Sequence, residues 1–302
     1  MFDTITKKLG EQYKNDFNSI ATDNKYNNEK LFNNSAIVDL DSYNQFASEL
    51  LIYYFMKRFA KSVKHDCIIR NGSKKDVDIV ADCFDDSSYK LNIEIKTPKK
   101  IINDSHEIKL VQEHRLSEGV IDFSCIAKKL KRAICKSGNS ELKINERGAI
   151  KDNPLKSQFD KSFEKFNNPT RNEINILFIC VDNETFCHFV DYIHNVDTGL
   201  YSKKPYFNLS DYKSIEYFII SNCCEAHIKK HDFNCWNLAN YENMVFANNS
   251  IEIDENKYLF VSRVFNDINP KYLKFFQKNA YEIGVPSHFV NCLSFLDREG
   301  WK

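Results

Sequence analysis

The chain has 302 residues, of which 42% are hydrophobic and 28% charged, so it is long enough to bury one large α/β core, alone or with an extension. Its 42 basic and 42 acidic side chains balance, which argues against a uniformly basic nucleic-acid coat protein; any nucleic-acid contact needs a local basic face. No apolar run long enough to span a bilayer is present and no apolar signal sequence follows Met1, so we expect a cytoplasmic protein without a membrane partner.

Three segments are expected along the chain. Residues 1–35 form a polar segment with a short helix near 4–17 and a linker over 23–34, residues 36–222 form the core, and residues 223–302 form an extension packed on that core. Several of the 10 cysteines lie inside apolar strands, for example Cys67, Cys83 and Cys180. We therefore expect reduced, buried thiols.

The apolar spacing predicts an α/β fold with a mixed central sheet flanked by helices. A helix is expected over 41–62, and three short strands that form an antiparallel meander are expected over 67–70, 76–83 and 89–97. Almost wholly apolar segments predict buried strands at 174–181 and 214–221, and a further strand is expected at 258–264. The remaining helices are expected at 104–117, 122–137, 154–166, 270–281 and 287–296.

The meander carries an unusual group of charges. Asp78 lies in its second strand, and Glu94 and Lys96 lie on one face of its third strand, since side chains alternate across a strand. Two carboxylates in a small volume are unfavourable unless a cation or hydrogen bonds compensate them, so we expect a metal site. Asp76 is the alternative ligand. The plainer interpretation is a solvated hairpin in which Glu and Lys pair across strands.

The helix over 41–62 adds Glu49, which is expected on the same side as Phe46 and Tyr53. A helix with an inward Glu, a strand with Asp78 and a strand with Glu94-x-Lys96 resembles the PD-(D/E)xK nuclease superfamily, whose fold is called restriction-endonuclease-like. The resemblance covers residues 39–181 and extends toward 221. It departs from the superfamily motif at Val77, which stands where a proline often precedes the Asp.

The resemblance implies a Mg²⁺-dependent phosphodiesterase, with Mn²⁺ as a substitute. Asp78, Glu94 and the backbone carbonyl of Ile95 would hold the metal, Lys96 would position the attacking water, and Glu49 would bind a second cation or a water. It further implies an endonuclease acting on DNA rather than RNA, a homodimer and a role in bacterial defence or restriction. The alternatives are a nuclease acting on RNA and a catalytically inactive binding or assembly module of the same fold.

Two further groups of residues are candidates. Cys223, His227, His231 and Cys235 have zinc-ligand types, and the last three would share a helix face, although their spacing matches no standard zinc finger. Basic or polar side chains that could border a cleft are Lys99, Lys100, the basic residues of 128–132, Gln158 and Lys161.

Overall fold

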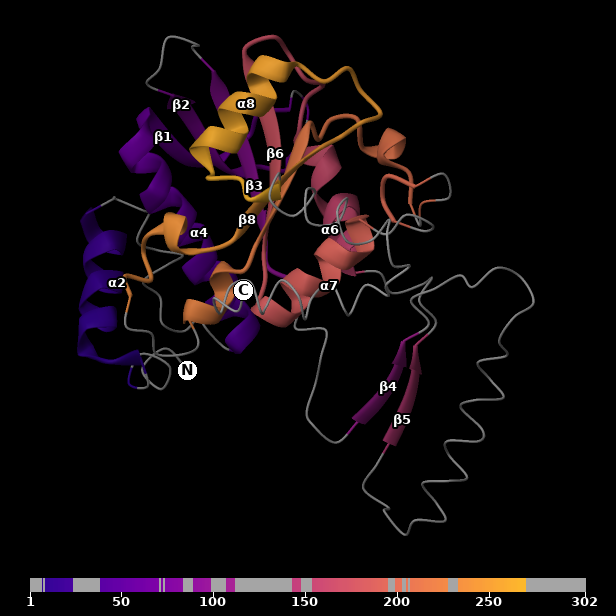
Figure 1. Cartoon of the computed structure of the whole chain (residues 1–302). Coiled ribbons are helices and arrows are strands. Elements are labelled where there is room, and N and C mark those ends of the chain that lie inside the picture. Colours follow the sequence, from indigo (N-terminus) through magenta and orange to yellow (C-terminus); the bar gives the residue numbers. More distant parts are fainter. Residues whose placement is uncertain are drawn as a thin grey trace, which may run out of the picture.

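The computed structural model describes residues 7, 9–23, 39–70, 72, 74–83, 89–98, 107–111, 143–147, 154–194, 199–202, 205, 207–227 and 233–269. Its centre is a six-stranded sheet with the strand order β1-β2-β3-β6-β7-β8 (Figure 1). The strands are β1 (Ala60–Cys67), β2 (Val77–Cys83), β3 (Lys90–Lys96), β6 (Glu173–Cys180), β7 (Tyr217–Ser221) and β8 (Asn243–Ala247). A separate parallel pair consists of β4 (Glu107–Val111) and β5 (Lys143–Arg147).

The described α-helices are α2 (Glu11–Asp23), α4 (Leu40–Phe59), α6 (Pro154–Ser162), α7 (Asn183–His194) and α8 (Glu255–Val264). Short 3₁₀ segments are η2 (Phe163–Lys165), η3 (Leu209–Tyr212), η4 (Cys223–His227) and η5 (Leu238–Asn240). None of the helices within these described residues is long and apolar enough to cross a lipid bilayer.

The expected mixed sheet is confirmed. β1, β2 and β3 form an antiparallel meander, as expected except for the position of its first strand. β3, β6 and β7 run parallel, and β8 is antiparallel to β7. The parallel strands β3, β6 and β7 all finish at the same end of the sheet. The start of β8 lies at that end too, because β8 runs in the opposite direction.

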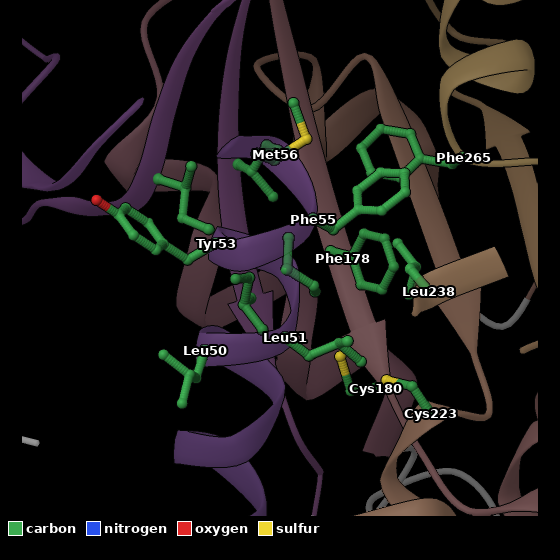
Figure 2. Packing of buried hydrophobic residues seen from close by; sticks show 14 of the residues in the cluster. Leu50, Leu51, Tyr53, Phe55, Met56, Phe178, Cys180, Cys223, Leu238 and Phe265 are labelled. Atoms are coloured by element: carbon green, nitrogen blue, oxygen red, sulfur yellow. The ribbon is translucent and has the colours of Figure 1, made fainter. Parts of the chain in front are cut away.

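Both faces of the sheet are buried, as the apolar run of β6 predicts. Ile176 and Phe178 of β6 belong to a core cluster that includes residues of α2, α4 and α8. Leu177 and Ile179 of β6 alternate with them and join a second cluster that includes residues of α6 and α7. On the first face, Figure 2 shows Phe55 of α4 close to Phe178 and Phe265; the ring centroids of Phe55 and Phe265 are 6.0 Å apart.

The helix α4 begins with a capping box. The Asp39 side chain accepts a hydrogen bond from the Ser42 backbone N–H at 2.8 Å, and the Ser42 hydroxyl oxygen accepts one from the Asp39 backbone N–H. The helix ends at Phe59 and β1 follows at once, so the prediction of a helix to 62 and a strand at 67–70 was wrong. The sequence of β1 is largely polar, and pairing with β2, a tertiary interaction, makes it a strand.

Other differences lie toward the two ends of the chain. Residues 255–264 form a helix rather than the strand predicted at 258–264, because the Asp254 side chain caps the backbone N–H groups of Asn256 and Lys257. Residues 107–111 form β4 inside the helix predicted at 104–117. The predicted helices at 122–137, 270–281 and 287–296 lie outside the described residues.

The two segments that were expected to flank the core, residues 1–35 and 223–302, both contribute to it. β8 lies within residues 223–302 and completes the sheet at one edge, and α2 lies within residues 1–35 and buries Tyr13 and Phe17. Tyr13 is fixed by two hydrogen bonds of 2.8 Å, one between its hydroxyl and the Tyr43 hydroxyl and one between its hydroxyl and His227 Nδ1. Free thiols are found at Cys67, Cys83, Cys180, Cys223, Cys224 and Cys235.

Candidate active site at the carboxyl end of β3

The strands β2 and β3 separate at the position of the predicted carboxylates. Their regular pairing ends at Ile79 opposite Ile93. One residue further, Asp78 Oδ2 accepts a hydrogen bond of 2.6 Å from the backbone N–H of Ile95. A side chain therefore replaces the next backbone acceptor, and a fork opens between the two strands at Asp78 and Glu94.

Glu94 is fully buried at this fork, with 0% of its side chain exposed. Its Oε1 atom forms ion pairs with Lys96 Nζ and with Lys165 Nζ, the latter at 2.6 Å. The two lysines are 18% and 15% exposed, so the three charges meet in a largely dry environment. Among the described residues neither carboxylate oxygen of Glu94 has a partner in regular hydrogen-bond geometry, and Oε2 has no ion pair either.

Lys165 comes from η2, immediately after α6, on the opposite side of the sheet from α4. Sequence reasoning missed it and selected Gln158 and Lys161 from the same region. Gln158 is buried and its Nε2 donates to the Pro154 carbonyl of its own helix at 2.8 Å, whereas Lys161 is exposed. The helical period gave no signal for Lys165, because α6 ends at Ser162 and the 3₁₀ segment η2 turns Lys165 away from the face of Lys161.

The helix α4 brings Gln45 and Glu49 to the same fork. Gln45 Nε2 donates to Glu49 Oε1 at 2.5 Å and lies 3.2 Å from the Ile95 carbonyl oxygen. Gln45 Oε1 accepts from the Thr97 backbone N–H at 2.9 Å. Gln45 therefore ties the end of β3 to α4. It was not predicted, although it lies one turn before Glu49 on the same helix face.

The carboxyl groups are held where their ionised forms are unfavourable. Burial, then the charges of Glu49 and Glu94, raise the pKa of Asp78 well above its usual value. Burial raises the pKa of Glu49 as well, and Glu94 adds to this effect. Burial by itself lowers the pKa of Lys96, but the neighbouring carboxylates of Glu94 and Asp78 outweigh it, so the pKa of Lys96 is raised and the side chain is cationic.

The residues offer the oxygen ligands that Mg²⁺ prefers: the carboxylates of Asp78, Glu94 and Glu49, and the Ile95 carbonyl. The buried Glu94 Oε2 atom without a partner and the raised pKa values of Asp78 and Glu49 fit a cation at this position. Within the described residues, however, no three His, Cys, Asp or Glu side chains are already arranged around one point as a metal site.

Of the other residues predicted for this site, the structure describes only Asp76, which does not join the fork. Asp76 precedes the first residue of β2, and the neighbour on which its charge acts is Cys67. The basic residues Lys99, Lys100 and those at 128–132 lie outside the described residues.

The structure describes three of the four candidate zinc ligands. Cys223 and His227 belong to a 3₁₀ segment and Cys235 to a turn, so the described positions are not part of an α-helix. His227 Nδ1 lies 2.8 Å from the Tyr13 hydroxyl, and Cys235 Sγ donates to the Phe233 carbonyl. These side chains secure the packing of α2 and the chain after η4; His231 lies outside the described residues.

Comparisons with known proteins give no match: no family model, no curated protein and no solved structure is similar to this chain.

Proposed function

We propose that this chain is a metal-dependent nuclease with a restriction-endonuclease-like fold that hydrolyses phosphodiester bonds. The observation that carries the proposal is the meeting of Asp78, Glu94, Lys96 and Glu49, from three separate elements, at the fork between β2 and β3. Burying several carboxylates together costs stability. A fold that keeps them there, with the pKa values of Asp78 and Glu49 raised, is typical of a functional site.

The proposal assigns each side chain a role. Asp78 and Glu94, with the Ile95 carbonyl, would hold Mg²⁺, which supplies Lewis-acid activation of water and phosphate when bound. Lys96 is cationic and would orient the attacking water and the phosphate oxygen through its three N–H donors. Glu49 is positioned by Gln45 and would accept a hydrogen bond from a water. Lys165 would transfer its ion pair from Glu94 to the substrate phosphate when metal binds.

The substrate is proposed to be DNA, in line with the resemblance to DNA endonucleases. RNA is the alternative, because a site that contacts only the phosphate distinguishes neither base nor sugar. The overall charge of the chain is zero, so binding depends on the local cations at the fork.

A second candidate function is favoured by one observation. The Glu94 carboxylate is already neutralised by two lysines, and no three metal-ligand side chains are gathered in the described residues. In a binding or assembly module that has this fold but no catalytic activity, Glu94 would stay paired with the two lysines permanently.

The decisive experiment combines cleavage with metal titration. Supercoiled plasmid, single-stranded DNA and RNA are incubated with the protein and Mg²⁺ or Mn²⁺, and calorimetry with Mn²⁺ measures metal uptake. We expect cleavage by the wild type and loss of at least about 100-fold in Asp78→Asn, Glu94→Gln and Lys96→Ala, the usual effect of removing a transition-state contact.

Matched controls come from the same elements. Asp82→Asn changes an exposed carboxylate of β2 that accepts from the Ser62 hydroxyl, and Lys161→Ala changes an exposed lysine of α6. Both should cleave like the wild type. Metal uptake that needs Asp78 and Glu94, without cleavage of any substrate, would reject the nuclease. Neither uptake nor cleavage would favour the inactive module.

A further inference from the structure

Residues 57–75 concentrate positive charge in a chain that is neutral as a whole. The segment contains seven Lys or Arg side chains and one acid, Asp66, so its net charge is +6 with His neutral. Of the 42 basic and 42 acidic side chains of the chain, this leaves 35 and 41 for all other residues, a net charge of −6. A stretch of this kind attracts polyanions.

The structure places the segment along one margin of the main sheet. It comprises the last turn of α4, the edge strand β1 and the turn toward β2 (Figure 1). The 8 residues of β1 span about 25 Å at roughly 3.3 Å per residue, so the cations are spread along a row. All seven side chains of this row, which we call the basic edge, are exposed: Lys57, Arg58, Lys61, Lys64, Arg70, Lys74 and Lys75.

One end of the basic edge lies beside the fork. β1 is antiparallel to β2, and Lys64 lies opposite Val80, two residues beyond Asp78. With strands about 4.8 Å apart and about 3.3 Å per residue along a strand, the Cα atoms of Lys64 and Asp78 are roughly 8 Å apart. A ligand on β1 is therefore close to the first carboxylate of the candidate site.

The turn between β1 and β2 approaches the fork from the side of η2. Arg70 Nη1 donates to the Glu164 carbonyl at 2.8 Å. The next residue, Lys165, forms an ion pair with Glu94. A guanidinium has five N–H donors, so Arg70 has further donors for an acceptor on a ligand. The basic edge and the fork thus form one continuous surface.

Most charges of the basic edge are not neutralised within the protein. Among the described residues, an ion pair joins Lys75 to Glu164, and the other six cations form none. Asp82, on the neighbouring strand, accepts from the Ser62 hydroxyl at 2.6 Å. Lysines on an edge strand also hinder pairing with a second chain. That role does not account for the basic residues of α4 and of the turn.

These features select a rigid ligand with regularly spaced negative charges. Duplex DNA carries one phosphate per 3.4 Å of axis on each strand, so about seven phosphates of one strand lie along the length of β1. Proteins that bind single strands use several aromatic side chains on which bases stack. Residues 57–75 contain one such ring, Phe59. The duplex is therefore the ligand that fits the basic edge.

We propose that the basic edge binds the sugar–phosphate backbone of duplex DNA and leads it to the fork. The inference rests on the proposed function for its biological sense, because the bound backbone would continue to Asp78 and Glu94. The contacts go to phosphates and carry no sequence information, so binding is independent of the base sequence. Binding depends on salt, because each neutralised phosphate releases counterions.

The test measures DNA binding in a chelator, where neither metal nor cleavage is needed. A fluorescent duplex of about 20 base pairs is titrated at several salt concentrations, and anisotropy reports binding. Each lost phosphate contact lowers the slope of log K against log salt by about 0.9, which is about eightfold in affinity at roughly 0.1 M salt. We expect Lys61→Gln/Lys64→Gln to bind about 60-fold more weakly and Arg70→Gln about eightfold more weakly.

The matched control is Arg171→Gln/Lys213→Gln, which removes the same charge at two exposed positions outside the basic edge. It should bind like the wild type. All variants change exposed side chains, and equal melting temperatures would verify that they are folded.

Several results would overturn the inference. They are wild-type affinity and slope in folded Lys61→Gln/Lys64→Gln, an equal loss in the control, or no binding of the duplex at all. Tighter binding of single-stranded DNA, of duplex RNA or of phosphatidylserine vesicles would assign the basic edge to that ligand instead. Duplex binding that needs the basic edge, without cleavage, would reject the proposed function but leave the inference. Cleavage with binding that does not need the basic edge would do the reverse.

Discussion

Replacing Glu94 by Gln should destabilise the metal-free protein strongly, although the change is isosteric. The side chain is 0% exposed and its charge is shared by the ammonium groups of Lys96 and Lys165. Gln leaves two partly dry cations facing a neutral amide, and breaking a buried pair from one side costs about 3–5 kcal/mol. For 302 residues the unfolding entropy near 60 °C is about 0.6 kcal/mol per kelvin. The melting temperature should therefore fall by about 5–8 °C.

Replacing Asp78 by Asn at the same fork should instead stabilise the metal-free protein. The pKa of Asp78 is raised in the folded protein, so the protonated form is favoured there and the free energy of unfolding decreases as pH rises through that pKa. Asn cannot ionise and can still accept from the Ile95 N–H. The variant should be more stable than the wild type at pH 7 without metal, by about 1–2 kcal/mol.

The assay for both variants is thermal and urea unfolding at pH 7 in a chelator, repeated with Mg²⁺. A saturating ion at ten times its dissociation constant adds about 1.4 kcal/mol to the wild type, and neither variant should gain it. If Glu94→Gln were as stable as the wild type, or Asp78→Asn clearly less stable, the charge arrangement argued for the fork would be refuted.

Other predictions concern groups away from the fork. Lys257→Met removes an ammonium that donates to the Thr170 and Glu173 carbonyls and to Glu216 Oε1 at 2.7 Å, so urea unfolding should show a loss of about 3–5 kcal/mol; a loss below 1 kcal/mol would contradict it. Burial lowers the pKa of His194 to about 4, below its unfolded value near 6.5, so the neutral ring stabilises the fold above pH 6.5 and about 3 kcal/mol is lost between pH 6.5 and 4. His194→Gln should flatten this part of the stability profile; an unchanged profile would exclude His194 as its origin. Tyr13→Phe removes the hydroxyl that joins Tyr43 and His227 and should cost about 1–3 kcal/mol, with faster hydrogen exchange in α2; unaltered exchange there would show that the contact does not hold the helix.

Much of the fold follows from local patterns in the sequence. The apolar run of β6 places this strand in the middle of a sheet covered on both faces, as the structure has it. β1 could not be found in the same way, because its polar sequence has no strand signal and pairing with β2 decides its conformation. α8 was mistaken for a strand because a short apolar segment fits both periods, and its cap at Asp254 was not weighed.

The candidate site, like the fold, was predictable from the sequence only in part. The sequence by itself determined that Asp78, Glu94 and Lys96 lie on adjacent strands, since a period of two and a short turn fix their faces. Only the tertiary structure decided that Lys165 and Gln45 join them and that β2 and β3 part at Asp78. The reason is physical: side-chain spacing along one strand is local, whereas the meeting of distant segments depends on how α4 and α6 pack on opposite faces of the sheet.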